Sequence, residues 1–300
     1  MRYAAIDIGS NAVRLLIADI IENNGSVSFK KNTLIRVPLR LGDDAFLNQH
    51  ISDKKADDLV KSMHAFRNLM DVYKVKDYMA FATSAMREAK NGDEVVARVK
   101  NEGNIDLEII HGQKEAKIIY ASHAEQTIDK NKTYLYIDVG GGSTELSLFS
   151  DGELFASRSF NIGTIRMLDN QDKEETWSEM HDFIREHTKV FKGVYGIGTG
   201  GNINKLYKLS EEKNGMPLSF AKLKTLYNYL NSFSLKDRIN VLGLNQDRAD
   251  VIIPACEIYI TVLKWANIKN IYVPSVGMVD GIIQTLIEKN FTKTYYNNFN

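Results

Sequence analysis

The sequence predicts an α/β protein of two domains that arose by internal duplication. A short phrase occurs twice, as Ala5-Ile6-Asp7-Ile8-Gly9-Ser10-Asn11 and as Ile137-Asp138-Val139-Gly140-Gly141-Gly142-Ser143-Thr144, about 131 residues apart. After each copy the same plan follows, in which three strands lead into alternating helices and strands. A chain of 300 residues is long enough to form two hydrophobic cores.

The first domain is expected over residues 1–129. Apolar strands surround the first phrase, Asn23-Asn24-Gly25 indicates a hairpin, and Ser52 precedes apolar residues at helical spacing. We expect strands over 3–8, 12–21, 27–37, 78–83 and 105–110, and helices over 53–73, 84–90, after Gly92, and from 113 to 128.

The second domain is expected over residues 130–300, after a polar connector at 129–132. Asp151-Gly152 indicates a hairpin between the strand that follows the second phrase and a third strand. We expect strands over 133–150 on either side of the glycine turn and over 154–161, 194–197 and 270–274, and helices over 174–190, across most of 202–266, and over 279–289. The last helix could pack back on the first domain.

Composition excludes several classes of function. The chain has 38 basic and 38 acidic residues, so a generally basic nucleic-acid binder is disfavoured, although a local basic groove is permitted. The longest apolar window, 251–266, is too short to span a membrane, and no signal peptide is visible. The single cysteine, Cys256, is expected to be a buried small side chain in a cytoplasmic protein.

The first phrase places a carboxylate at the end of a buried strand. Such a group is costly unless it is paired, hydrogen-bonded or bound to a cation. Gly9, Ser10 and Asn11 would let backbone N–H groups approach an anion, and period-two alternation turns Arg14 away from the core. Arg14 could therefore grip phosphate. An ordinary hairpin with a surface arginine is an equally good interpretation of this copy alone.

The second phrase is more specific. Three consecutive glycines weaken a strand, so Gly140, Gly141 and Gly142 indicate that something approaches the backbone there. Glu145 occupies the position that Arg14 holds in the first copy. Asp138 and Glu145 are plausible Mg²⁺ ligands, because Mg²⁺ prefers few carboxylates together with waters and phosphate oxygens. The alternative is a flexible hairpin with solvated carboxylates.

Glu115 lies where a strand ends and a helix begins, in His111-Gly112-Gln113-Lys114-Glu115-Ala116. A helix N-terminus favours any carboxylate, so Glu115 could have a purely structural role in stabilising this helix. In the context of two phosphate turns, Glu115 could serve as the base that deprotonates water.

Three weaker signals lie elsewhere in the chain. Ser84 could cap a helix after another strand end and Arg87 could be a solvated residue of that helix, or both could line a phosphate path. Arg248, where an apolar helix begins, could form an ion pair instead of a ligand contact. Gly196–Gly201 fits a dinucleotide fingerprint as a bare pattern. No strand ending in an acid follows at the required distance, so a glycine turn at the same site is favoured.

Together these segments resemble the Ppx/GppA phosphatases of the actin/hexokinase/Hsp70-like superfamily. The matching residues run in family order from residue 3 to about 285, through Asp7–Arg14, 83–89, 112–116, 137–145, 198–201 and 248–250. We expect a short form of this family, without the C-terminal HD-like helical extension that many relatives carry. Processivity on long chains and a homodimer are left open.

The resemblance implies two ribonuclease-H-like domains with an active-site cleft between them. It also implies hydrolysis of a terminal phosphoanhydride, with Glu115 as the catalytic base and Asp138 and Glu145 as residues that handle Mg²⁺ or Mn²⁺. Phosphate-binding residues are then expected at Asp7, Gly9, Ser10, Asn11, Arg14, Ser84, Arg87, Gly140, Gly141, Gly142, Ser143, Thr144, Gly200 and Arg248. The expected partner is inorganic polyphosphate, or guanosine pentaphosphate as the alternative substrate, with no nucleic acid and no membrane.

Two further functions remain open at this stage. One is an ATP-dependent kinase of the same superfamily, in which Gly198–Gly201 would contact adenosine. The other is a sensor that binds a phosphate chain without hydrolysing it, which the complete set of Glu115, Asp138 and Glu145 disfavours.

Overall fold

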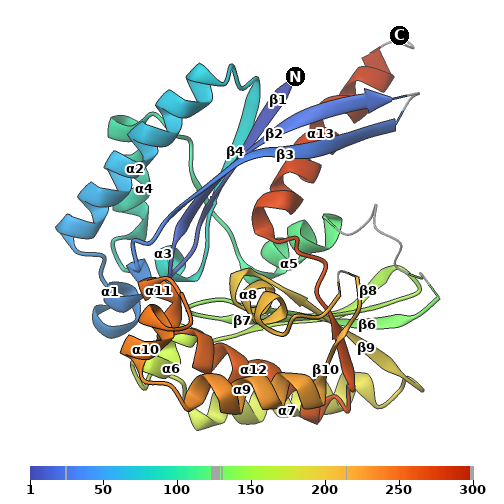
Figure 1. Cartoon of the computed structure of the whole chain (residues 1–300). Coiled ribbons are helices and arrows are strands. Elements are labelled where there is room, and N and C mark those ends of the chain that lie inside the picture. Colours follow the sequence, from blue (N-terminus) through green and yellow to red (C-terminus); the bar gives the residue numbers. More distant parts are fainter. Residues whose placement is uncertain (24–25, 123–128, 130, 214, 298–300) are drawn as a thin grey trace. The chain divides into compact units, whose positions relative to one another are not determined.

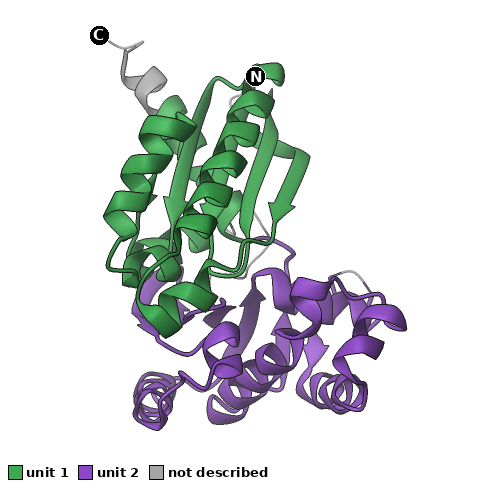
Figure 2. Cartoon of the chain, turned by 90° about the vertical axis from the view of Figure 1, so that its left-hand side faces the viewer, with its two compact units in different colours: residues 1–126, 277–300 green, residues 127–276 purple. Residues whose placement is uncertain are grey.

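The chain divides into two compact units. A computed structural model describes residues 1–23, 26–122, 129, 131–213 and 215–297. Unit 1 comprises residues 1–126 and 277–300, and unit 2 comprises residues 127–276 (Figure 2). The predicted second domain extended to residue 300, with a last helix that could pack back on the first domain; residues 277–300 cluster with unit 1. The predicted hairpin residues 24–25, the helix end at 123–128 and Lys130 of the connector lie outside the described residues.

Unit 1 contains a five-stranded sheet among its described residues, in the order β3-β2-β1-β4-β5. Its strands are β1 (Arg2–Ile8), β2 (Val13–Asn23), β3 (Ser26–Val37), β4 (Asp77–Ala82) and β5 (Glu108–Ile109). Its helices are α1 (Leu41–Asn48), α2 (Asp53–Val72), α3 (Ser84–Glu88), α4 (Gly92–Gly103), α5 (Gly112–Ala121) and α13 (Met278–Asn297).

Helices α5 and α13 cover one face of this sheet, and α2 and α4 lie on the other side (Figure 1). Alternation sets the faces, since Tyr3, Ala5, Leu16 and Ala18 share a buried cluster with the apolar residues of α5 and α13. Asp7 follows the same alternation from Ala5. Asp7, at the end of β1, therefore projects from the face that α5 and α13 cover.

Unit 2 repeats the plan with a six-stranded sheet among its described residues, in the order β10-β11-β9-β6-β7-β8. Its strands are β6 (Thr133–Val139), β7 (Thr144–Ser150), β8 (Glu153–Phe160), β9 (Val194–Thr199), β10 (Leu218–Ser219) and β11 (Asn270–Tyr272). Its helices are α6 (Thr164–Leu168), α7 (Glu174–Thr188), α8 (Gly201–Leu209), α9 (Phe220–Asn231), α10 (Leu235–Asn240), α11 (Gln246–Ala249) and α12 (Ile252–Trp265).

Helix α12 forms the centre of the unit 2 core. Its apolar residues join the inward-facing side chains of β6 and β7 and the buried faces of α7 and α9 in one cluster. Cys256 is fully buried within it, and burial raises the pKa of its thiol to about 12. The expected role of Cys256 as a buried small side chain is confirmed.

The α/β class and the repeated three-strand plan are confirmed, with local differences. Strand β5 is shorter than predicted because the chain leaves α4 through Asn104 in the left-handed region and pairs with β4 only at Glu108 and Ile109. The short helices α1 and α6 and the strand β10 were not predicted. No helix in the described part of the chain is long and apolar enough to cross a membrane.

Candidate functional site

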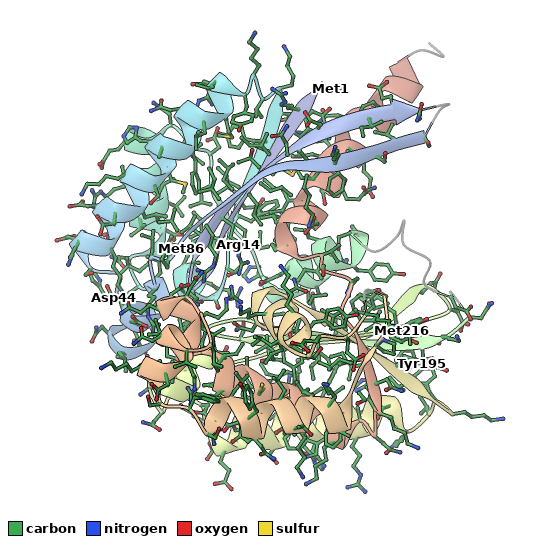
Figure 3. The ribbon with its side chains drawn as sticks, viewed as in Figure 1. Met1, Arg14, Asp44, Met86, Tyr195 and Met216 are labelled. Carbon is green, nitrogen blue, oxygen red and sulfur yellow. The ribbon has the colours of Figure 1, made fainter. Side chains whose placement is uncertain are left out.

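The first turn of unit 1 is held by an ion pair between two adjacent strands. Asp7 and Arg14 are direct partners in the antiparallel β1–β2 pair, and Arg14 Nη1 donates to Asp7 Oδ2 at 2.7 Å. The Asp7 carboxyl is 3% exposed. Burial is the larger effect and raises its pKa, while Arg14 opposes the rise. Arg14, labelled in Figure 3, was predicted to bind phosphate; in this structure its guanidinium pairs with Asp7.

The backbone of this turn is fixed from several sides. Gly9 N donates to Ala12 O at 3.1 Å and closes the turn, and Gly42 N at the start of α1 donates to Ser10 O at 2.9 Å. The buried hydroxyls of Ser10 and Ser84 are 2.8 Å apart, so the turn after β1 meets the start of α3 here. The structure therefore brings together the predicted residues Ser10 and Ser84. Asn11 belongs to the same turn, and its backbone O accepts from Arg40 N at 3.0 Å.

Glu115 lies in the first turn of α5, on the sheet face from which Asp7 projects. Its neighbour Lys114 places Nζ 4.8 Å from the ring centroid of Phe81, which is the register partner of Asp7 on β4. The N-terminal turn of α5 therefore lies near the end of β4, beside the position where Asp7 ends β1. Glu115 is half-buried and lies at the N-terminal end of the helix, where the helix dipole interacts favourably with acidic side chains.

Arg87 fastens α3 to the same region of unit 1. Its Nη1 donates to the carbonyl oxygen of Ile110, just before α5, at 2.8 Å. Arg87 was predicted to bind phosphate, but its Nη1 group is used here to position the chain that leads into α5.

The second turn, in unit 2, repeats this geometry with acidic side chains. Asp138 and Glu145 are direct partners in the antiparallel β6–β7 pair, and Gly140 N donates to Ser143 O at 2.9 Å. Each of these positions is 131 residues after its counterpart Asp7, Arg14, Gly9 or Ala12. The two copies of the phrase are equivalent in backbone structure and differ in charge.

Glu145 is held by two hydroxyl groups. Its carboxylate is 5% exposed, and Oε1 accepts from Ser143 at 2.6 Å and from Ser159 on β8 at 2.8 Å. The two donated hydrogen bonds hold this carboxylate in one orientation. Ser159 was not predicted from the sequence.

The three glycines of the second turn are clamped by the segment that leads into α6. Thr164 N donates to Gly140 O at 3.0 Å, and Ile165 N donates to Gly141 O at 2.8 Å. A Cβ atom on Gly163 would lie 2.4 Å from Gly141 O, so only glycine permits this approach. The Arg166 guanidinium donates to Gly142 O from a buried position. Thr144 Oγ1 donates to Ile162 O at 2.7 Å, so its hydroxyl supports this same segment.

Gly200 and Arg248 complete this part of unit 2. Gly200 has φ of 95°, and a Cβ atom there would lie 2.8 Å from Asp138 Oδ1. Arg248 Nη1 donates to Gly201 O and to Asn202 Oδ1, so Arg248 secures the start of α8. The glycine turn therefore lies directly against the Asp138 carboxylate, which is the arrangement favoured over a dinucleotide site.

The strand registers extend each turn into a row of side chains across its sheet. In unit 1 the row is Phe81, Asp7, Arg14 and Arg36, and in unit 2 it is Thr199, Asp138, Glu145 and Ser159. Arg14 and Arg36 are register partners on β2 and β3. Like Ser159, Arg36 and Thr199 were not among the site residues predicted from the sequence.

The Asp7–Arg14 pair leads to a prediction about stability. Replacing Arg14 by leucine should leave Asp7 buried without its cation, at a cost of about 2 kcal/mol in the free energy of unfolding near pH 8. The Asp7 pKa is already raised in the folded protein, and the variant should raise it further. Protonation as the pH falls through that pKa removes the unpaired charge, so the difference from wild type should shrink toward pH 4.

Urea unfolding of both proteins at pH 8, 6 and 4 measures this difference. Arg67→Leu is the control, because Arg67 forms an exposed pair with Asp71 whose loss should cost well under about 1 kcal/mol. A deficit for Arg14→Leu that stays constant with pH would show that Asp7 does not cause it.

Comparison with known proteins identifies the family. The model of the Ppx/GppA phosphatase family matches residues 20–290. A bifunctional 3-dehydroquinate synthase/phosphatase of Fusobacterium nucleatum is 29% identical over 83% of this chain, which spans 41% of that protein's length. Exopolyphosphatase 1 of Mycobacterium leprae is 23% identical, over 94% of this chain and 88% of its own.

A solved structure shows the same fold. The crystal structure of an exopolyphosphatase from Cytophaga hutchinsonii has a TM-score of 0.84 at 24% identity, and the match covers 96% of this chain and 98% of that chain. With a family model that matches most of its length, this chain belongs to the Ppx/GppA phosphatase family.

Proposed function

We propose that this protein is an exopolyphosphatase that releases terminal phosphate from inorganic polyphosphate by attack of water. The observation that carries the proposal is the pair of equivalent turns, one with Asp7 and Arg14 and one with Asp138 and Glu145. The turn with Arg14 suits the phosphate groups of a substrate, and the turn with two carboxylates suits the metal ion that accompanies them. The name of the M. leprae relative supports the same reaction.

The acidic turn fits a magnesium ion. Asp138 and Glu145 project from directly paired positions, and cross-strand neighbours lie about 5 Å apart at their Cβ atoms. The described residues include no group of three or more histidine, cysteine or acidic side chains that could hold a metal ion. Two carboxylates suit Mg²⁺ or Mn²⁺, which take waters and phosphate oxygens as further ligands, and do not suit a zinc site. A bound divalent ion would neutralise phosphate charge.

The chain's own residues would then carry the reaction. Gly9 N and Gly140 N close their own turns, so the predicted backbone contacts to phosphate oxygens fall to the N–H groups of Ser10–Asn11 and Gly141–Ser143, and Arg14 would neutralise phosphate charge. Glu115 accepts a proton from water while the water oxygen bonds to the terminal phosphorus. The bridging P–O bond breaks, and its electron pair leaves with the shortened chain.

A phosphate-release assay tests the proposal. The purified chain should release phosphate from polyphosphate with Mg²⁺ and lose this activity with a chelator. Guanosine pentaphosphate is the second arm, and a higher kcat/KM for it would replace polyphosphate as the substrate. ADP formation from ATP only with an added acceptor would indicate a kinase, and binding without release would indicate a sensor.

The Ser159 hydroxyl provides a specific test of the metal assignment. Ser159→Ala removes one of the two hydrogen bonds to Glu145 Oε1, so the carboxylate should be less well oriented. The Mg²⁺ concentration for half-maximal activity should rise by about tenfold, with a smaller change in kcat at saturating metal. Ser157→Ala is a matched control on the same strand, because Ser157 pairs with Ser147 instead. An unchanged metal requirement in Ser159→Ala would contradict the role of Glu145 as a ligand.

A further inference from the structure

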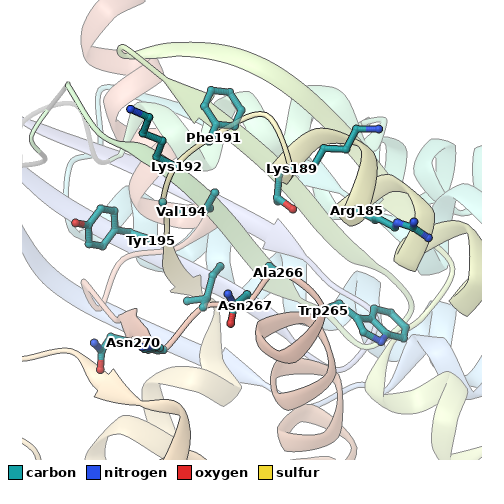
Figure 4. Close-up of a pocket in the computed structure, with 14 residues that line it drawn as sticks. Arg185, Lys189, Phe191, Lys192, Val194, Tyr195, Trp265, Ala266, Asn267 and Asn270 are labelled. Carbon is teal, nitrogen blue, oxygen red and sulfur yellow. The ribbon is translucent and has the colours of Figure 1, made fainter.

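Unit 2 has a second concave site whose lining is rich in cations. This pocket, of about 560 Å³, lies where β9 and β11 begin and where α7 and α12 end. Figure 4 shows Arg185 and Trp265 at one end of the pocket and Tyr195 and Asn270 at the other, with Val194 and Asn267 between them. Its volume is in the range of small-molecule sites.

The pocket is remote from the glycine turns. It includes Val194, the first residue of β9, whereas Thr199 at the other end of that strand is the partner of Asp138. Five strand steps of about 3.3 Å separate these two ends by roughly 17 Å. The pocket and the turn that carries Asp138 and Glu145 thus lie at opposite ends of the strands of one sheet.

Four cationic side chains line the pocket, and no carboxylate does. They are Arg185, Lys189, Lys192 and Lys269, all of them exposed. Within the residues that the structure describes, none of the four forms an ion pair. The whole chain has equal numbers of basic and acidic residues, so this excess is local.

Helix dipoles do not account for the excess. The C-termini of α7 and α12 reach the pocket at Lys189 and Ala266, and each contributes about half a negative elementary charge. About one negative charge therefore faces four positive ones. The lining therefore keeps a net positive charge, which attracts a multivalent anion. An aromatic ring and an amide, Trp265 and Asn267, are also present in the lining.

We propose that this pocket binds a linear oligophosphate group, free or as the tail of a nucleotide. A chain of several charged phosphates matches cations that are distributed around one concavity, and Arg185 can hold two phosphate oxygens at once. The choice of phosphate among anions rests on the proposed function, whereas the excess of cations does not. The site would give the protein a second contact with a phosphate chain, separate from the residues proposed for hydrolysis.

Tryptophan fluorescence of the full chain tests this site. The two tryptophans, Trp177 and Trp265, have ring centroids 6.1 Å apart, so both report on the pocket. Tripolyphosphate, titrated with a chelator present to prevent turnover, should change the emission saturably. The double variant K192Q/K269Q should bind about tenfold more weakly. The control K224Q/K236Q removes two exposed lysines outside the pocket and should bind as wild type does.

The outcomes separate this inference from the proposed function. An unsaturable signal, or equal weakening in both double variants, would overturn the site. Equal affinity for tripolyphosphate and ATP supports recognition of the phosphate chain. Tighter binding of ATP supports additional stacking of the base on Trp265. Sulfate binding as tight as tripolyphosphate binding would overturn the preference for oligophosphate. Phosphate release by wild-type protein without this fluorescence response would refute the pocket alone. A response without release would refute the hydrolase alone.

Discussion

Replacing Glu115 by glutamine should lower kcat for phosphate release by about 10²–10⁴ and leave the KM for polyphosphate nearly unchanged. The amide is close in size to the carboxylate but cannot accept the proton of the attacking water. Glu115 is well placed for this role, because it lies in the first turn of α5, whose neighbouring residue Lys114 contacts Phe81, the register partner of Asp7. Initial rates across polyphosphate concentrations give the two constants separately.

A matched control shows whether the loss comes from the proton acceptor or only from lost charge. Glu108 precedes α5 and pairs with Lys114 at 2.6 Å, so Glu108→Gln removes one negative charge from the same region. It should retain kcat within about twofold, since an exposed pair contributes little. Full turnover in Glu115→Gln would exclude Glu115 as the base. Circular dichroism confirms that both variants are folded.

The two turns could be predicted because their information is local. An apolar strand, an aspartate and small residues in sequence determine where each hairpin turns. Counting outward from such a turn also gives the register, so Asp7 faces Arg14 and Asp138 faces Glu145 without any interruption in the ladder. The equivalence of Arg14 and Glu145 follows from the same count.

Ser159 shows why part of the site could not be predicted. Near the hairpin, Ser150 pairs with Glu153, and counting from there would place Arg158 opposite Glu145. A bulge between Leu148 and Phe149 shifts the register by one residue and places Ser159 there instead. Because a shift of one residue exchanges the two faces of a strand, the bulge decides whether Glu145 meets a hydroxyl or a guanidinium.

The segments that support the turns were also missed for a physical reason. Helix α6 has five residues, which is too few for a helical repeat of apolar side chains to be recognised. Helix α1 begins after Arg40, whose φ of 52° is unusual for a residue other than glycine. Both segments are stabilised by backbone hydrogen bonds to a turn that is distant in sequence. Such tertiary contacts leave no pattern in one sequence.

The contact between α5 and α13 should be the most sensitive packing position in unit 1. A Cβ atom on Gly281 would lie 1.9 Å from the backbone oxygen of Ile118, and backbone cannot move aside as a side chain can. Gly281→Ala should therefore separate the two helices and lower the free energy of unfolding of unit 1 by about 3 kcal/mol. Urea unfolding measures the loss, and hydrogen exchange of α5 and α13 locates it.

Gly277→Ala is the control for Gly281→Ala, because it makes the same substitution at a position where nothing lies within 4 Å of the new Cβ atom. It should unfold within about 0.5 kcal/mol of wild type. Ile118 follows Glu115 by three residues on α5, so a displaced helix should also lower phosphate release in Gly281→Ala. Wild-type stability in Gly281→Ala would show that the close contact of the two helices does not hold α13 against unit 1. Lost stability with full activity would instead place the proton acceptor elsewhere than on α5, since a base on that helix could not remain in position when the helix moves.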